Sequence, residues 1–145
     1  MKKKILIASD HAAYPVKSHL VYWLKKEGFE VTDLGTDSEE SVDYADFGHK
    51  LGEIIDRDSS YIGIALCGSG IGMNMSIGKH KKTRSALCWN VEIAQLARLH
   101  NDANVLILPG RFITQNEAEA IVDVFLNTDF EGGRHERRIK KIPIN

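Results

Sequence analysis

The chain alternates between short apolar runs and longer segments in which apolar residues recur every three or four positions. The apolar runs, which are typical of buried strands, are residues 4–9, 30–34, 61–66, 84–89 and 105–108. The segments between them predict helices at 14–27, around 47–55, and at 71–79, 91–99, 114–126 and 134–141. Continuous apolar strands that alternate with helices indicate a parallel sheet covered on both faces. We therefore expect an α/β fold with five parallel strands.

Composition narrows the range of functions. The 145 residues are the size of one domain, so we expect a single domain at 1–145, with a basic C-terminal helix at about 134–141. A net charge of −1 argues against nonspecific nucleic-acid or membrane-surface binding and favours a small-molecule substrate. The two cysteines are too few for a disulfide framework, and no apolar N-terminal segment resembles a signal peptide or a membrane span. These features fit a cytoplasmic protein.

The third apolar run ends abruptly in the sequence Cys67-Gly68-Ser69-Gly70-Ile71-Gly72. Glycines at alternate positions allow successive N–H groups to converge on an oxyanion or a phosphate before a helix begins. A thiol among such groups should have a lowered pKa, which suits it to proton transfer near neutral pH. Cys67 is therefore the first candidate for chemistry. The alternative, a small buried apolar residue at a strand end, stays open on this spacing alone.

Polar residues adjoin other strands as well. Ligands of open parallel sheets bind outside the carboxyl ends of the strands. Asp10 and His11 follow the first strand, and His100-Asn101 lies in the segment before the last one. Both groups could face the same crevice as Cys67, although His100 would need a different route to it. A capping Asp10 with a satisfied His11, and a helix that merely ends at His100-Asn101, are the structural alternatives.

The remaining histidines have no partner pattern. We expect His19, His49, His80 and His135 to lie on the solvated surface. We also expect no metal site, because no paired spacing of histidine, cysteine or carboxylate falls on one helix face.

Three arginines are candidates for binding a phosphate group. Arg134 and Arg138 are one turn apart if the C-terminal segment is helical, so two guanidinium groups could hold one phosphate. Together with Arg111 after the last strand, they would form a cationic wall facing the glycine turn. The alternative is an ordinary solvated basic helix.

Several phosphate-binding classes do not fit the glycine turn. Position 73 is methionine, so neither the dinucleotide glycine fingerprint nor a phosphatase with cysteine and arginine six positions apart is present. No glycine-lysine-serine/threonine run indicates a nucleoside-triphosphate loop. Nucleotide binding and attack of the thiol on phosphorus are therefore disfavoured.

Taken together and in order, the motifs resemble those of the type B ribose-5-phosphate isomerases, in the family shared with the galactose-6-phosphate isomerase subunits. The resemblance covers nearly the whole chain, and its matching runs are 9–11, 35–36, 43–44, 67–72, 100–105 and 131–135. It implies a Rossmann-like three-layer sandwich and a cofactor-free aldose–ketose isomerase of the pentose phosphate pathway that requires no metal. It also implies a homodimer, or a dimer of dimers, with active sites shared between subunits.

The resemblance implies a role for each part of the glycine turn. Cys67 would be the base that carries a proton between C2 and C1 of the open-chain sugar; a second branch of the family has glutamate at the position of Met73. Ser69 would hydrogen-bond near the reacting carbons. The enediolate oxygen would accept hydrogen bonds from the backbone of Gly68, Gly70, Ile71 and Gly72.

The resemblance also implies how the sugar is opened and held. His100 and Asp10 would open the furanose ring by acid–base transfer, with Asn101 positioning the intermediate. Tyr44 would line the sugar pocket. The phosphate would be held by His11, Arg111, Arg134 and Arg138.

Two other functions stay open. One is a 6-phosphohexose isomerase that acts on allose or galactose phosphates, since pocket depth decides the length of the sugar. The other is a non-catalytic sugar-phosphate sensor, although a sensor has no need of Cys67, His100 and Asp10 together.

Overall fold

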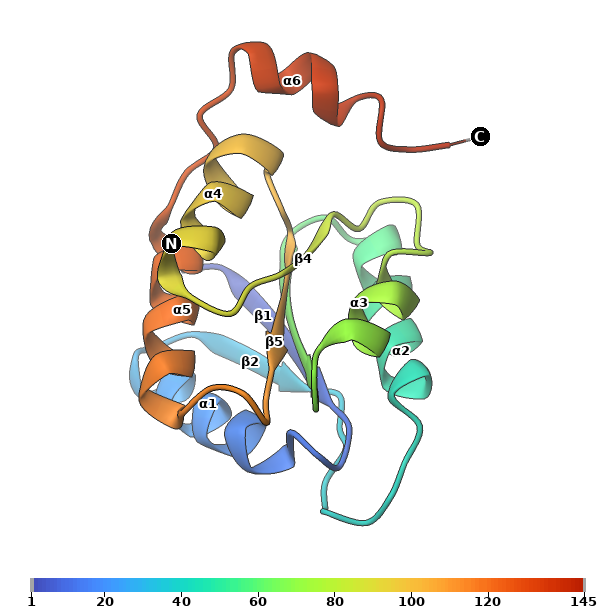
Figure 1. Ribbon diagram of the computed structural model, residues 1–145, viewed down its shortest axis with the longest axis vertical. Helices are drawn as coiled ribbons and strands as arrows, with labels where there is room; N and C mark the ends of the chain where they lie inside the picture. The colour runs from blue at the N-terminus through green and yellow to red at the C-terminus, as the bar shows by residue number, and fades with distance from the viewer. Residues whose placement is uncertain (1, 145) are drawn as a thin grey trace.

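The computed structural model describes residues 2–144, which form a five-stranded parallel sheet with helices on both faces (Figure 1). The elements are β1 (Lys4–Ser9), α1 (Tyr14–Lys26), β2 (Glu30–Asp33), α2 (Tyr44–Arg57), β3 (Tyr61–Cys67), α3 (Ile71–Ile77), β4 (Ser85–Leu87), α4 (Val91–Asn101), β5 (Val105–Pro109), α5 (Gln115–Asn127) and α6 (Arg134–Ile139). The expected Rossmann-like α/β fold is confirmed. The domain expected at 1–145 includes Met1 and Asn145, which lie outside the described residues. Among the described helices, none combines the length and the apolar character that crossing a membrane requires.

The strands are ordered β2-β1-β3-β5-β4, and every neighbouring pair is parallel. Each connection between parallel strands needs a crossover, which is almost always right-handed. The crossovers through α1 and α4 step in one direction along the sheet, and those through α2 and α3 step in the other. Helices that step in opposite directions must therefore cover opposite faces.

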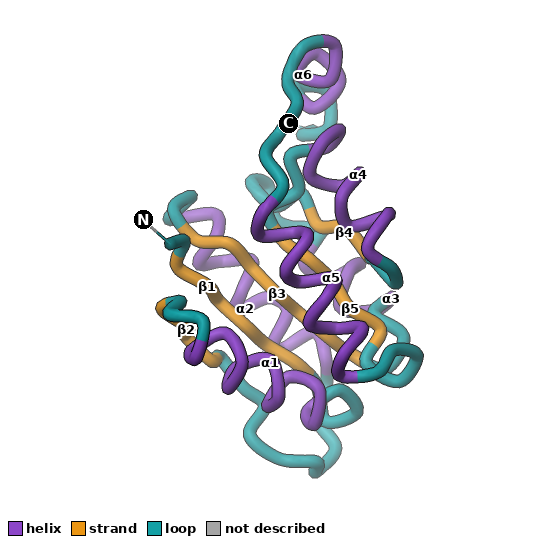
Figure 2. The backbone as a smooth tube through the Cα atoms, turned by 90° about the vertical axis from the view of Figure 1, so that its left-hand side faces the viewer, coloured by secondary structure: helices purple, strands orange, loops and turns teal. Residues whose placement is uncertain are grey.

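Helices lie on both sides of the sheet (Figure 2), and the buried apolar side chains form two core layers, one on each side of it. Successive side chains of a strand point to opposite faces. In β1, Ile5 and Ile7 pack in the layer under α1, α4 and α5, whereas Leu6 and Ala8 pack in the layer under α2 and α3. All four side chains are buried, which explains why the strands read as continuous apolar runs rather than alternating ones.

The direction in which successive strands are added to the sheet reverses at the pair β1 and β3, because β2 lies on one side of β1 and β3 lies on the other. Ser9, the last residue of β1, is in register with Leu66, the residue before Cys67. The segments that follow β1 and β3 therefore leave the sheet side by side, which makes this edge the expected place for a ligand.

Candidate functional site

A hollow of about 520 Å³ opens at the carboxyl ends of β1, β3 and β5. Nine of the residues singled out from the sequence line it: Asp10, His11, Tyr44, Cys67, Gly68, Ser69, Ile71, Gly72 and Arg111. Gly70 is buried behind the turn. Ala12 and Met75 also line the hollow, and neither carried a signal in the sequence because an isolated small or apolar residue has no chemical pattern.

The glycine turn delivers the Cys67 thiol to the floor of this hollow. Gly70 has a φ of 78°, a left-handed conformation that favours glycine, and α3 begins at the next residue. The backbone N–H groups of Gly70, Gly72 and Met73 hydrogen-bond to the thiol. The expected convergence of amides is present, and they surround the sulfur itself.

The expected lowering of the thiol pKa is wrong. The pKa of Cys67 is raised, first because burial penalises the charged thiolate and also because the Asp10 carboxylate is close. Hydrogen bonds from the three amides act in the opposite direction without overcoming burial. Cys67 is only 4% exposed and packs in the core layer under α2 and α3 while it borders the hollow. The sequence pattern reveals the amides but not how deeply the fold buries the sulfur.

Asp10 and His11 are held by the backbone around them. The Asp10 side chain is 6% exposed, lines the hollow and accepts a hydrogen bond from the N–H of Ala13 at 3.2 Å. This bond closes the turn before α1, and the helix itself begins after Ala13 without a side-chain cap. Nδ1 of His11 accepts a hydrogen bond from the N–H of Val42 at 3.1 Å. In a neutral ring, the proton of His11 is therefore on Nε2, which is a donor suited to an anion.

Tyr44 and Arg111 are placed by close contact with the glycines. A Cβ on Gly72 would collide with the Tyr44 ring, so only glycine lets the ring lie against the turn. The N–H of Arg111 donates to the Gly68 carbonyl at 3.0 Å, and the neighbouring Gly110 donates to the Cys67 carbonyl at 2.9 Å. These bonds join the loop after β5 to the loop after β3 and place the Arg111 side chain beside Gly68 at the hollow.

The other predicted site residues lie at the opposite end of the sheet. His100 and Asn101 are in the last turn of α4, and Arg134 and Arg138 are on α6, which extends beyond that end of the molecule (Figure 1). The expectation that His100, Arg134 and Arg138 face the same crevice as Cys67 is therefore wrong within one chain, whereas Arg111 does line the hollow. The reason is topological, because α4 runs antiparallel to the strands and ends at their amino-terminal edge.

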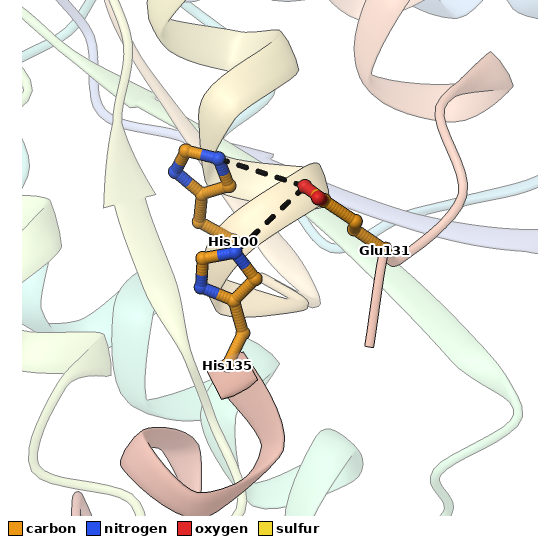
Figure 3. Close-up of side chains that lie close together, drawn as sticks. All are labelled: His100, Glu131 and His135. Atoms are coloured by element: carbon orange, nitrogen blue, oxygen red, sulfur yellow. Dashed lines mark ion pairs between the residues drawn. The ribbon is translucent and has the colours of Figure 1, made fainter. Parts of the chain in front are cut away.

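At this second end, two histidines and a carboxylate gather (Figure 3). The rings of His100 and His135 stack at an interplanar angle of 16°, with centroids 4.4 Å apart, and Glu131 lies beside both. His135 is only 5% exposed, so its expected place on the solvated surface is wrong. Burial and the charges of His100 and Arg134 lower the pKa of His135. These three residues could hold a metal ion, a grouping that spacing along one helix does not reveal because they come from three separate segments.

The remaining histidines form local pairs. His49, which is exposed, has its Nδ1 atom 2.9 Å from Nε2 of His80. His19 is half-buried and pairs with Glu119.

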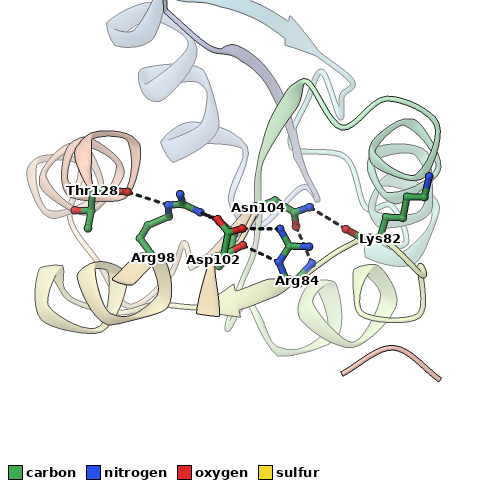
Figure 4. A network of polar contacts seen from close by, with 7 residues as sticks. Lys82, Arg84, Arg98, Asp102, Asn104 and Thr128 are labelled. Carbon is green, nitrogen blue, oxygen red and sulfur yellow. Dashed lines mark hydrogen bonds and ion pairs between the residues drawn. The ribbon is translucent and has the colours of Figure 1, made fainter. Parts of the chain in front are cut away.

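A polar network holds the end of α4 in place (Figure 4). Arg98 donates to the carbonyls of Ala103 at 2.6 Å and Thr128 at 3.0 Å, and to the Asp102 carboxylate at 2.9 Å. Arg84, next to β4, donates to the Asp102 carbonyl at 2.7 Å. The network therefore fixes the turn that carries His100 and Asn101 relative to β4, β5 and the end of α5.

Comparison with known proteins relates this geometry to a family. The family model described as Ribose/Galactose Isomerase matches residues 5–142. Ribose-5-phosphate isomerase B of Escherichia coli K12 is 36% identical over 140 residues, which cover 97% of this chain and 94% of the relative.

Solved structures agree over the full fold. A ribose 5-phosphate isomerase of Thermotoga maritima is 50% identical with a TM-score of 0.96, and the match covers 99% of each chain. Ribose-5-phosphate isomerase B of Mycoplasma genitalium, solved with bound ribulose-5-phosphate, is 42% identical with a TM-score of 0.93, over 96% of this chain and 93% of that one. With a family model that spans nearly the whole sequence, this chain belongs to the ribose/galactose isomerase family.

Proposed function

We propose that this chain interconverts D-ribose 5-phosphate and D-ribulose 5-phosphate through a cis-enediolate. The observation that carries the proposal is the Cys67 thiol, which receives three backbone N–H groups at the floor of a hollow lined by His11 and Arg111. Relatives named as ribose-5-phosphate isomerases, one of them holding ribulose-5-phosphate, support the same reaction. We place the reaction in the pentose phosphate pathway.

The proton moves between two neighbouring carbons. The Cys67 thiolate removes the proton from C2 of the open-chain aldose, and the electrons of that bond form the C1–C2 double bond as the carbonyl oxygen on C1 becomes an enediolate. The thiol then returns the proton to C1, while the oxygen on C2 becomes the ketose carbonyl and its proton passes to the oxygen on C1. Each N–H donor aimed at the developing charge contributes about 3 kcal/mol to such a step. Ser69, which is part of the glycine turn, lines the hollow and supplies a hydroxyl for the sugar.

The phosphate binds at the cationic side of the hollow. The Nε2–H group of His11 and the guanidinium of Arg111 are donors available within one chain. Contacts to the phosphate are remote from the reacting carbons, so their binding energy is used to orient C1 and C2 against the base.

A second copy of the chain completes the site. We infer a homodimer in which His100, Asn101, Arg134 and Arg138 of one chain serve the hollow of the other. Two features support this arrangement. The end of α4 and α6, which carry these four residues, lie at the opposite end of the sheet from the hollow of their own chain (Figure 1). Apolar side chains that line the hollow are exposed, Ile71 by 50% and Met75 by 66%. His100 of the partner would then open the furanose ring with Asp10.

A direct isomerase assay tests the proposal. Purified protein should convert ribose 5-phosphate, with a lower kcat/KM on allose or galactose 6-phosphate. Cys67→Ala should abolish turnover, because it removes the base, whereas Cys88→Ala should remain active. Exchange of the C2 hydrogen in heavy water should occur with the wild type, because a sensor that only binds the sugar would leave that hydrogen in place. Full activity of Cys67→Ala would contradict the proposed mechanism.

A further inference from the structure

The cluster of His100, Glu131 and His135 joins three segments that are separate in the fold (Figure 3). His100 ends α4, Glu131 lies between α5 and α6, and His135 is on α6. The Glu131 Oε2 atom is 3.7 Å from Nε2 of His100 and 3.7 Å from Nε2 of His135. One donor atom from each residue lies within 4.8 Å of the others. Two imidazole nitrogens and a carboxylate oxygen therefore surround one small region.

A second, independent observation at His135 indicates that a ligand belongs in this region. Its Nε2 atom is buried and has no hydrogen-bond partner among the described residues. His135 is only 5% exposed. The 3.7 Å between its Nε2 atom and Oε2 of Glu131 is too long for a hydrogen bond. A buried polar atom without a partner is costly, and an ion is one of the groups that resolve it.

We propose that His100, Glu131 and His135 bind a divalent metal ion of the zinc class, and that this metal competes with the role of His100 in ring opening. The second half rests on the proposed function. Two imidazoles and one carboxylate form a ligand set that zinc prefers, and they leave a fourth position for water. Tetrahedral bonds of about 2.0–2.2 Å place ligand atoms roughly 3.3–3.5 Å apart, so the 3.7 Å separations need to close by only a few tenths of an ångström.

The backbone around the cluster is already arranged. The N–H of Glu131 donates to the Leu99 carbonyl at 3.1 Å, which fixes the acidic residue beside the last turn of α4. Gly132 and Gly133 have φ values of 74° and 61°, so glycine is favoured at both positions of the bend that leads into α6. This bend places Glu131 and His135 beside one another.

The side chains differ in their freedom to move. The His135 side chain is 7% exposed and fixed, whereas those of His100 and Glu131 are 39% and 50% exposed. Stacked parallel rings direct their lone pairs side by side, so His100 must tilt to coordinate the ion. The positive charges of Arg134 and Arg138 oppose a cation here. We therefore expect zinc to bind more weakly than it does at a structural zinc site.

A metal on Nε2 of His100 occupies the lone pair that would accept a proton during ring opening. The metal would thus inhibit the isomerase reversibly.

Zinc titration of the EDTA-treated and desalted protein tests the site directly. Competition with a chromophoric chelator should give one zinc ion per chain. Glu131→Gln keeps the shape of the side chain and should weaken binding at least about tenfold, as should His135→Gln. His19→Gln is the matched control, because His19 also pairs with a glutamate but has no second histidine beside it, and it should bind zinc as the wild type does. Circular dichroism checks that each variant is folded. Absence of binding by the wild type at 100 μM zinc, or unchanged affinity in a folded Glu131→Gln variant, would overturn the proposal.

The proposed inhibition of the isomerase by zinc is measured separately. Isomerase turnover should fall as the site fills and return when EDTA removes the zinc, and folded Glu131→Gln should need at least about tenfold more zinc for the same inhibition. An active isomerase that binds no zinc would refute the metal site and leave the proposed function intact. Stoichiometric zinc binding by a protein that isomerises no sugar would support the site and remove the proposed function.

Discussion

The two cysteines show how one residue type acquires different properties from its surroundings. Both are buried, and burial raises the pKa of both thiols. Only Cys67 receives hydrogen bonds from backbone amides and borders the hollow. Cys88 is 0% exposed in the opposite core layer, and its pKa is raised to about 12. Reactivity should therefore belong to Cys67, and the larger pH-dependent stability effect to Cys88.

Alkylation with iodoacetamide should modify Cys67 slowly and Cys88 not at all in the folded protein. The thiolate is the reacting species, so a raised pKa makes the rate at pH 7.5 lower than that of a small model thiol. The rate should rise about tenfold per pH unit between pH 7 and 9, because the thiolate fraction does so below the pKa. Mass spectrometry after timed quenching measures both sites. A Cys67 rate that levels off below pH 8 would show a lowered pKa instead.

Cys88 should make the protein less stable at alkaline pH. The folded state holds the thiol proton up to a pKa of about 12, compared with 9.0 for an unperturbed thiol, so the contribution of Cys88 is fully present below pH 9 and is lost as the pH rises toward 12. The free energy of unfolding should fall by on the order of 2 kcal/mol more between pH 8 and 10.5 in the wild type than in Cys88→Ala. Urea denaturation at both pH values measures this difference. Equal pH slopes in the two proteins would contradict it.

At the scale of elements, the end of α4 depends on Arg98. This side chain is 6% exposed and is shared by α4, the loop before β5 and the residue that ends α5. Asp102 has a φ of 45°, and its carboxylate lies between Arg98 and Arg84. The polar network therefore adds to the apolar contacts of Ala97, Ala103 and Phe125, which join the same three elements.

Arg98→Met should destabilise the fold by about 2–4 kcal/mol, because the carbonyls of Ala103 and Thr128 lose a buried charged donor. Chemical denaturation measures the change. Arg57→Met is the control: Arg57 is exposed in the last turn of α2, and its loss should cost less than about 0.5 kcal/mol. A cost below 1 kcal/mol for Arg98→Met would mean that the network adds little to stability.

The sequence predicts the elements better than their arrangement. The strand expected at 30–34 is observed at Glu30–Asp33, and the helix expected at 114–126 is observed at Gln115–Asn127, since local apolar spacing and capping residues mark both. The strand expected at 84–89 is only Ser85–Leu87, because it lies at the sheet edge and pairs with β5 alone. The position of β5 between β3 and β4 comes from crossover packing over long sequence distances, which local patterns do not encode.

At the scale of the whole molecule, the same distinction applies to the candidate site. The groups at the ends of β1 and β3 could be placed together from the sequence, because neighbouring parallel strands end at one edge. The burial of His135 could not, since it results from the packing of its ring on His100 across two helices. The distance between His100 and Cys67 within one chain also depends on the direction of α4. The proposed function therefore requires that a second chain complete the site.

Hybrid dimers test this requirement. Cys67→Ala and His100→Asn homodimers should each be nearly inactive, because every site in them lacks one essential group. In a dimer with one chain of each kind, each shared site combines position 67 of one chain with position 100 of the other. One of the two sites then contains both Cys67 and His100, and the other contains neither. Differently tagged chains, co-expressed and purified through both tags, should thus recover about half of the wild-type kcat. If each chain formed its whole site from its own residues, the hybrid would remain as inactive as its parents.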